Sequence, residues 1–153
     1  MQLADVVALD AIIPALKVTN KKQALQELAA KAAKLSGQNE RTVFDSLVQR
    51  EKLGSTGVGN GIAIPHGKLT DLNKLFGVFA RLDRPIDFEA LDGQPVDLVF
   101  LLLAPEGAGA DHLKALARVA RLLRDPDIAR KLRQSRDAEA IYAVLALPSA
   151  SAA

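Results

Sequence analysis

The chain has 153 residues, of which 49% are hydrophobic and 25% are charged, a size and balance that predict one compact domain with one core. It contains no cysteine, which excludes disulfide bonds and thiolate metal sites. Its 20 basic and 18 acidic residues give a formal net charge of +2, a balance too even to indicate nucleic-acid binding.

No segment of the sequence is typical of insertion into a membrane. The longest apolar run, Leu98–Ala104, is far shorter than the ~20 residues that a membrane-spanning helix needs. The start of the chain lacks the basic and then apolar pattern of a secretory signal. We therefore expect a soluble, cytoplasmic protein without membrane insertion.

The first part of the chain predicts a short extended segment followed by two helices. Extended geometry is expected around residues 12–13. Asn20 can cap a helix that ends at Gly37, because apolar residues recur at helical spacing between these positions. A second helix is expected over residues 40–53, with Gly54 ending it. The connection between the two helices is short, so we expect them to pack antiparallel.

A glycine-rich segment and two strands occupy the middle of the chain. Residues 54–67 contain five glycines and a proline, a density that no regular helix tolerates, around a strand-like run at residues 62–64. Strands are expected over residues 77–82 and 96–104, with a turn at Asp92-Gly93 before the second. The second run is almost continuously apolar, which is typical of a central strand buried on both faces.

The last third predicts three helices and a short tail. Apolar spacing indicates a helix over residues 113–123, Pro126 separates it from the next, and further helices are expected over 127–134 and 137–146. Residues 149–153 are small and are expected to be a disordered tail. Basic residues gather here in a patch that can meet an acidic partner: Lys114, Arg118, Arg121, Arg124, Arg130, Lys131, Arg133 and Arg136.

The order of these elements predicts the fold class. A helix pair, then strands, then further helices favour a single α/β domain with one mixed β-sheet flanked by helices on both faces. The order of the strands within that sheet does not follow from the pattern.

His66 is the strongest candidate for chemistry in the sequence. Pro65 fixes its own φ and Gly67 allows another backbone to approach, so the imidazole is presented at a strand end. With an ordinary pKa of about 6.5, the ring is largely neutral in the cytoplasm and one nitrogen is free to attack phosphorus. If a backbone carbonyl accepts the Nδ1 proton, Nε2 is the nucleophile. The alternative is a polar residue in a glycine-rich turn.

Three other side chains are notable. His112 follows Asp111 at a helix N-terminus, which suits a bound anion, although a solvated histidine is the alternative and nothing in the sequence brings it near His66. Arg50 ends the second helix, where it can bind a phosphate with two hydrogen bonds or remain solvated. Glu51 falls on an apolar stripe and needs a polar partner if it is buried.

Other site classes are excluded by missing patterns. The two histidines are far apart in the chain and lack the local ligand spacing of zinc sites, so no metal is expected. The glycine-rich segment has neither the Gly-Lys-Ser/Thr ending of a nucleotide loop nor G-x-G-x-x-G spacing, and G-x-S-x-G is absent. No cofactor is expected.

The segment Arg50–Lys68, REKLGSTGVGNGIAIPHGK, resembles the phosphorylation-site segment of the fructose/mannitol-type enzyme IIA family of the bacterial phosphotransferase system. It is similar above all to the nitrogen-type, or nitrogen-regulatory, branch of that family. Residues 77–79, 85–88, 94–98 and His112-Leu113 also resemble this branch, so the resemblance spans nearly the whole chain.

The resemblance implies a domain of this type over residues 1–148, with His66 as the phosphorylated nucleophile. Arg50 and His112 then fall on the companion positions that stabilise the transferring group. The remaining implied positions shape the phosphate pocket: Gly59, Asn60, Gly61 and Gly67. The implied donor is an HPr-like, nitrogen-type phosphocarrier protein.

Two roles are open for such a carrier. In the first, phosphorylation of His66 changes which target proteins the surface binds, such as potassium-transport or sensor-kinase components. In the second, the chain is a sugar-transport component that passes phosphate to a separate enzyme IIB. A nucleic-acid-binding module is a third possibility, but only 4% of the residues are aromatic and a solvated basic helix face is the simpler interpretation.

Overall fold

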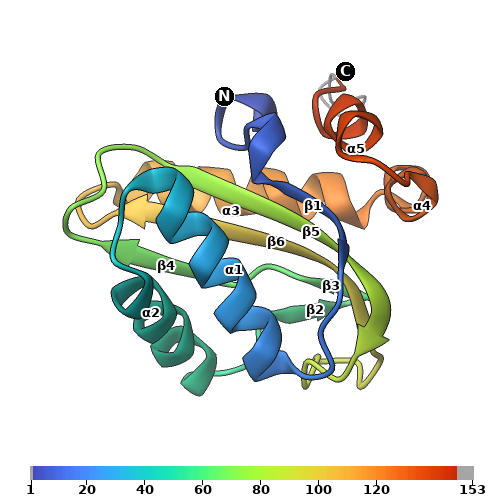
Figure 1. Cartoon of the computed structure of the whole chain (residues 1–153), viewed down its shortest axis with the longest axis horizontal. Coiled ribbons are helices and arrows are strands. Elements are labelled where there is room, and N and C mark those ends of the chain that lie inside the picture. The colour runs from blue at the N-terminus through green and yellow to red at the C-terminus, as the bar shows by residue number, and fades with distance from the viewer. Residues whose placement is uncertain (1, 148–153) are drawn as a thin grey trace.

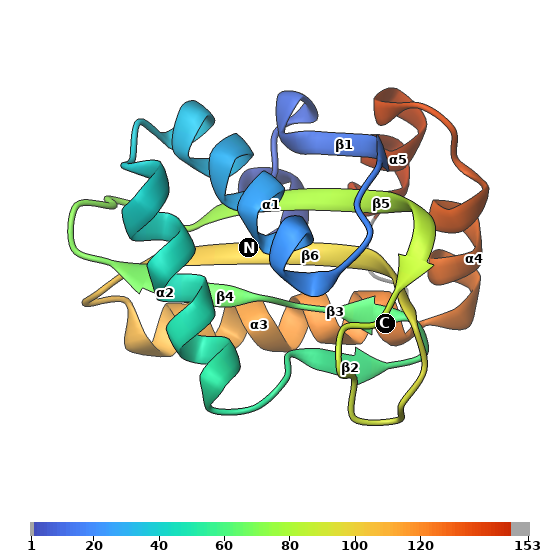
Figure 2. The same cartoon turned by 60° about the horizontal axis from the view of Figure 1, so that its bottom comes forward.

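A computed structural model describes residues 2–147, and in this part of the chain six strands form one mixed sheet. The order of neighbouring strands is β1-β5-β6-β3-β2, and β4 also pairs with β6 (Figure 2). The β5–β6 and β2–β3 pairs are antiparallel, whereas the β1–β5, β3–β6 and β4–β6 pairs are parallel. The strands are β1 (Ile12–Leu16), β2 (Gly57–Gly59), β3 (Ile62–Ala63), β4 (His66–Leu69), β5 (Phe76–Ile86) and β6 (Val96–Pro105).

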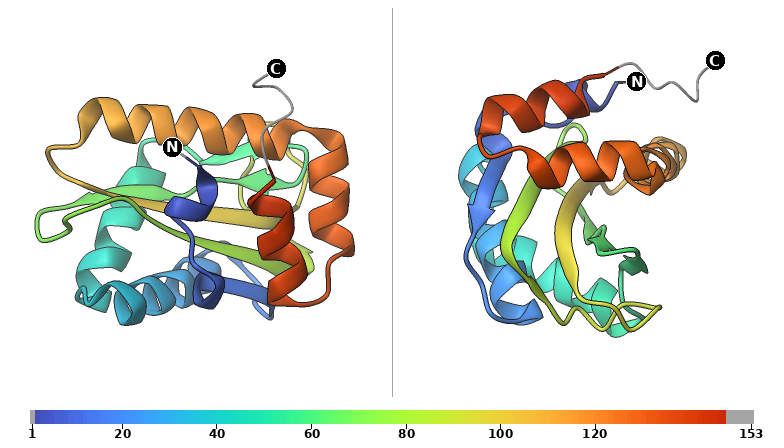
Figure 3. Two further views of the ribbon diagram at one scale, coloured as in Figure 1. Left: turned by 90° about the horizontal axis from the view of Figure 1, so that it is seen from above. Right: turned by 90° about the vertical axis from the view of Figure 1, so that its right-hand side faces the viewer.

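Helices cover both faces of this sheet, as the sequence predicted. In Figure 1, α1 crosses in front of the sheet beside α2, while α3 runs behind it. The two views of Figure 3 show the same separation, with α4 and α5 at one end. Helix α5 packs against β1 and against two short 3₁₀ helices near the start of the chain, η1 (Leu3–Asp5) and η2 (Leu9–Ala11). The α-helices are α1 (Lys21–Ser36), α2 (Glu40–Lys52), α3 (Gly109–Arg124), α4 (Pro126–Gln134) and α5 (Ala138–Leu145).

The core is centred on β6. Residues Leu98–Leu103 of this strand are all fully buried, because α1 and α2 cover one face of the sheet and α3 covers the other. Phe100 packs edge-to-face with Phe79 of β5, with ring centroids 6.3 Å apart. The prediction of a central strand buried on both faces is therefore confirmed.

Several local signals are also confirmed. The side chain of Asn20 caps α1 by accepting from the backbone N–H of Gln23 at 2.8 Å, and Gly37 ends this helix in the left-handed region with φ +75°. Gly93 closes the predicted turn with φ +73°. The predicted tail, residues 149–153, lies outside the described residues.

The glycine-rich segment was only partly predicted. It contains β2 and β4 as well as the expected strand. Backbone pairing overrides its low strand propensity, because β2 pairs with the adjacent β3 and β4 pairs with the distant β6. Strand β5 also continues to Ile86, beyond its predicted end at residue 82. Within the predicted range, the guanidinium of Arg81 donates to the carbonyl oxygens of Arg133 and Pro14 at 3.0 and 3.1 Å, which fixes this polar side chain.

The break between β3 and β4 is what positions the site. Both strands run parallel to β6, and the backbone N–H of Leu102 donates to the carbonyl of Pro65 at 3.0 Å across the break. His66 is the first residue of β4. Beyond the end of β6, a short loop leads into α3, whose first turn contains His112. The topology therefore brings two distant parts of the chain together.

Candidate phosphoryl-transfer site

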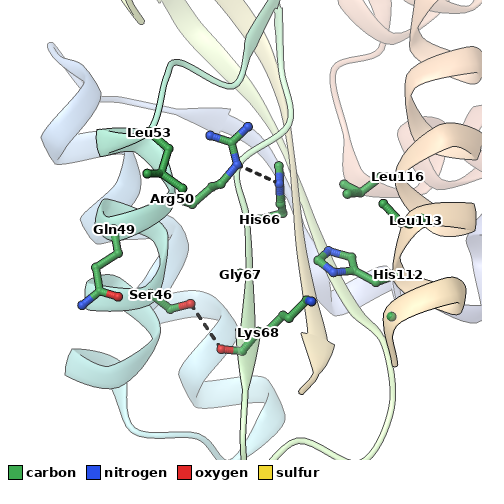
Figure 4. A pocket seen from close by; sticks show the side chains of 11 residues that line it. Ser46, Gln49, Arg50, Leu53, His66, Gly67, Lys68, His112, Leu113 and Leu116 are labelled. Carbon is green, nitrogen blue, oxygen red and sulfur yellow. Dashed lines mark hydrogen bonds between the residues drawn. The ribbon is translucent and has the colours of Figure 1, made fainter. Parts of the chain in front are cut away.

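His66, His112 and Arg50 meet in one surface hollow of about 730 Å³ (Figure 4). Its rim is apolar and exposed: the side chains of Leu53 and Leu113 are among the most exposed hydrophobic groups of the described residues. No carboxylate is among the residues that line the hollow, so its charged groups are all basic. The lining residues are Ser46, Gln49, Arg50, Leu53, His66, Gly67, Lys68, Gly109, His112, Leu113 and Leu116.

The hydrogen bonds of His66 define its neutral tautomer. Nδ1 lies 2.9 Å from the carbonyl oxygen of Ile64, which can only accept a proton. The Nε of Arg50, which can only donate, lies 3.1 Å from Nε2. Both contacts are satisfied together only if Nδ1 carries the hydrogen and Nε2 presents its lone pair. The backbone acceptor that the sequence analysis anticipated is therefore present.

The surroundings of His66 favour its neutral form. Burial is the largest cause that lowers the pKa of this half-buried imidazole below its ordinary value of 6.5. The nearby Arg50 lowers the pKa further, whereas the hydrogen bond to Ile64 and the charge of Glu51 oppose the shift. Near neutral pH the lone pair on Nε2 is thus retained.

His112 lies beside His66, which the sequence did not indicate. The two ring centroids are 5.6 Å apart and the rings are nearly perpendicular, at 75°. His112 is only 5% exposed, and its Nε2 has no hydrogen-bond partner among the described residues. Burial lowers its pKa first, and the charges of His66 and Lys68 add to that shift. A buried polar nitrogen without a partner costs free energy. Because His112 lines the hollow, a ligand bound there could supply the missing hydrogen bond to Nε2.

Arg50 reaches the hollow from the last turn of α2. Besides its bond to His66, its Nη1 donates to the carbonyl of Gly54 at 2.8 Å. The guanidinium therefore bridges the end of the helix and the imidazole (Figure 4). Its remaining donors can serve an anion beside His66.

The predicted pocket glycines separate into two groups. Gly67 lines the hollow, and a Cβ at this position would overlap the hydroxyl of Ser46, so its lack of a side chain lets α2 approach β4. Gly59 ends β2, Asn60 and Gly61 form the turn between β2 and β3, and none of these residues is among those that line the hollow. The structure does not bring these three residues to His66.

Lys68 is a site residue that sequence reasoning did not single out. It lines the hollow from β4, and its ammonium group points toward His112 in Figure 4. The sequence could have predicted this position, because Lys68 lies two residues after His66 and side chains two residues apart in a strand lie on the same face. No such pattern predicted the apolar rim, since Leu53 and Leu113 are distant in the chain and come to the same hollow only through the fold.

The described residues contain neither a metal cluster nor a membrane-spanning helix. No group of three or more histidine, cysteine, aspartate or glutamate residues in range 2–147 is arranged to hold a metal ion. None of the helices within that range is long and apolar enough to cross a membrane.

Comparison of the whole chain with known proteins identifies the family to which it belongs. Residues 6–147 match the family described as "Phosphoenolpyruvate-dependent sugar phosphotransferase system, EIIA 2". The chain belongs to this EIIA family. Membership gives this EIIA chain a phosphocarrier role in the phosphotransferase system, in which it interacts with other phosphocarrier proteins.

The relatives of this EIIA chain point to one branch of the family. It is 78% identical to a nitrogen regulatory protein of Bradyrhizobium diazoefficiens over 153 residues, which cover all of both chains. It is 42% identical to a nitrogen regulatory protein of Escherichia coli over 146 residues, 95% of this chain and 90% of that protein. The crystal structure of nitrogen regulatory protein IIA-Ntr from Neisseria meningitidis superposes with a TM-score of 0.89 and 36% identity, covering 94% and 98% of the two chains.

Proposed function

We propose that this chain carries a phosphoryl group on Nε2 of His66, receives it from an HPr-like phosphocarrier protein of the nitrogen type, and regulates target proteins through its phosphorylation state. The observation that carries this proposal is the tautomer of His66, whose nucleophilic nitrogen faces an open hollow lined only by basic charges. The similarity to nitrogen regulatory proteins supports the regulatory role.

In the proposed reaction, the phosphorus–nitrogen bond of the donor breaks as the bond from phosphorus to Nε2 of His66 forms, and the donor nitrogen keeps the electron pair. The ring gains positive charge, and the carbonyl of Ile64 stabilises the proton that stays on Nδ1. Because the lone pair on Nε2 is consumed, Arg50 must release its hydrogen bond to His66. Its guanidinium then donates to the phosphoryl oxygens together with His112.

The shape of the hollow suits a donor that is itself a protein. Phosphoryl transfer between two histidines needs both rings in line at one phosphorus, so His66 has to be reachable by a protein surface. Leu53, Leu113 and Leu116 form an apolar rim around the basic centre. Apolar contacts at this rim can hold the donor while the basic side chains neutralise the phosphoryl group.

The test is incubation with phosphoenolpyruvate, enzyme I and the nitrogen-type phosphocarrier, followed by intact mass. We expect one acid-labile phosphoryl group on the wild type and none on His66→Ala. Arg50→Gln and His112→Ala should slow transfer by about a hundredfold, as loss of one stabilising donor does at other sites. Arg41→Gln, an exposed arginine on the same helix, is the matched control and should transfer normally. An unmodified wild type with an active donor would overturn the proposal.

A sugar-transport role is the second candidate, and it is favoured by the family description, which names a sugar phosphotransferase system. The two roles share the chemistry at His66 and differ in the acceptor of the phosphoryl group. Rapid transfer from the phosphorylated chain to a purified enzyme IIB would favour transport. Binding of a regulatory target that depends on phosphorylation, without transfer, would favour regulation.

A further inference from the structure

Glu51 is a buried carboxylate next to the site that the proposed mechanism does not use. Its side chain is 6% exposed, on the opposite side of the α2 backbone from the hollow that Arg50 enters. Nζ of Lys21, at the start of α1, lies 2.9 Å from Oε1. Thr56 donates to the same carboxylate twice, from its backbone N–H at 3.0 Å and from its hydroxyl. Four polar groups therefore meet on a stripe of α2 that is otherwise apolar: the carboxylate of Glu51, the ammonium of Lys21, and the N–H and hydroxyl of Thr56.

A series of hydrogen bonds leads from this carboxylate to the imidazole of His66. The carbonyl of Thr56 accepts from the backbone N–H of Ile64 at 3.0 Å. The carbonyl of Ile64 then accepts from Nδ1 of His66 at 2.9 Å. The N–H and the carbonyl of Ile64 belong to neighbouring peptide groups, so the position of Thr56 restrains the backbone that carries the acceptor for His66.

We propose that Glu51 is a positioning residue for His66, which acts through Thr56 and Ile64 to hold the imidazole in the tautomer that leaves Nε2 free. This inference rests on the proposed function, because the tautomer matters for transfer only if His66 is the phosphorylated residue. Glu51 does not touch the imidazole or the hollow. It fixes the loop before β2, and Thr56 in that loop accepts from the N–H of Ile64, whose carbonyl is the acceptor for His66.

The burial of Glu51 explains why this arrangement is rigid. A buried carboxylate is stable only when it is paired and hydrogen-bonded, so Glu51 restrains Thr56 and Lys21 more firmly than an exposed side chain would. Lys21 is restrained in turn, since its ammonium lies 4.9 Å from the centre of the Phe88 ring. The first turn of α1, the end of α2 and the loop before β2 are thereby joined at one point.

Glu51 also acts on His66 through its charge. Its negative charge raises the pKa of His66, against burial and against Arg50, which lower it. The other charged or titratable groups lining the hollow near His66 are Lys68 and His112, and neither carries a negative charge. Because the negative charge of Glu51 raises the pKa of His66, removal of that charge should lower the pKa of the ring.

The first experiment measures the tautomer of His66 by nitrogen-15 NMR on the unphosphorylated full chain. We expect the wild type to carry its hydrogen on Nδ1. In Glu51→Gln, the ratio of the Nε2-protonated form to the Nδ1-protonated form should rise by about tenfold and the pKa of His66 should fall. Glu89→Gln is the matched control, because Glu89 also contacts Lys21, at 3.6 Å, but its side chain is 74% exposed and makes no bond to Thr56. This control should leave the tautomer unchanged.

The second experiment measures the rate of phosphoryl transfer from the donor to the folded fraction of each variant. Glu51→Gln should lose about tenfold, within the hundredfold that a displacement of about 1 Å can cost. Thr56→Val, which keeps the backbone bond but loses the hydroxyl, should show both effects in weaker form even if Glu51→Gln folds poorly.

The outcomes separate this inference from the proposed function. A Glu51→Gln variant that is less stable but keeps the wild-type tautomer and rate would overturn the positioning role and leave only a structural one. A wild type that accepts no phosphoryl group would overturn the proposed function. The tautomer measurement would still show whether Glu51 orients His66, because it needs no donor.

Discussion

Two glycine-containing segments lie on either side of β3 and differ in whether they reach the hollow, although the sequence predicted residues of both in the phosphate pocket. The first is Gly59, Asn60 and Gly61, and the second is Pro65, His66 and Gly67. Only the second lines the hollow. Glycine-rich composition therefore predicts irregular backbone, but it does not identify the part of that backbone that faces a ligand.

The reasons for glycine differ in the two segments. At Gly61 the backbone has φ +80°, a conformation that side chains with a Cβ disfavour. The turn is also held from outside: Asp92 accepts from the N–H of Asn60 at 3.0 Å, and Arg133 donates to the carbonyl of Asn60 at 2.7 Å. At Gly67, φ lies outside the left-handed region, and glycine is needed because Ser46 of α2 is so close.

The largest effect is expected from Gly67→Ala, which tests the hollow directly. The added Cβ overlaps the Ser46 hydroxyl, which must leave the carbonyl of Lys68, and it comes within 3.2 Å of the Ser46 Cβ, so α2 must also shift slightly from β4; together these should lower the free energy of unfolding by about 1–3 kcal/mol. Arg50 moves with α2, so transfer to His66 should fall by about tenfold or more. Denaturant unfolding and the intact-mass assay measure the two effects. Wild-type transfer in the variant would show that the spacing of α2 and β4 does not matter for the site.

A smaller effect, on stability alone, is expected from Gly61→Ala. The left-handed backbone costs an alanine about 1–2 kcal/mol. Its Cβ would also come within 2.9 Å of Oδ1 of Asp97, which forms an ion pair with Arg133. The midpoint temperature of thermal unfolding should decrease, while the phosphoryl-transfer rate of the folded protein stays at the wild-type value. A slowed rate would mean that this turn belongs to the phosphate pocket after all.

The smallest mutational effect is expected from Asn60→Ala. Asn60 adopts φ 57°, which asparagine tolerates better than alanine, so the loss of stability should be about 1 kcal/mol or less. Its contacts to Asp92 and Arg133 use backbone atoms and remain. Asn60→Gly is the control and should be at least as stable as the wild type. Phosphoryl transfer by both variants, measured by intact mass, should equal that of the wild type.

The two segments are also expected to lose stability at different pH, which can be tested without any mutation. The pKa values of His66 and His112 lie below the ordinary 6.5, so below that pH the unfolded chain binds more protons and the free energy of unfolding decreases. The pKa of Asp92 is lowered by its bonds to the backbone of Asn60 and Gln94, so the turn loses stability only near and below the ordinary value of 3.8.

Denaturant unfolding between about pH 8 and pH 5 measures this difference. His112→Gln should show a shallower loss of stability than the wild type, because it removes one of the two lowered histidine pKa values. Asp92→Asn should give a curve parallel to that of the wild type over the same range, because the lost contribution of Asp92 does not change with pH there. A wild type that becomes more stable as the pH falls from 7 would contradict the lowered pKa values.

The local sequence pattern predicted the helices and strands better than it predicted which of them lie side by side in the fold. Apolar spacing and caps found α1, α2 and the central strand β6, since those signals lie within one segment. The proximity of His112 to His66 did not follow, because it depends on the parallel pairing of β4 with β6 and on the loop after β6. The partner of Glu51 was missed for the same reason: Lys21 is 30 residues earlier in the chain.

The packing of α5 against η1 places the two ends of the described chain next to each other, at the top of Figure 1, while the hollow lies near α2 and the start of α3. Neighbouring ends can be joined by a short linker, and new ends can be opened at an exposed turn such as Asp92-Gly93. The domain is therefore suited to circular permutation, and a fluorescent label attached near Gln2 or Leu147 would lie away from the hollow that contains His66.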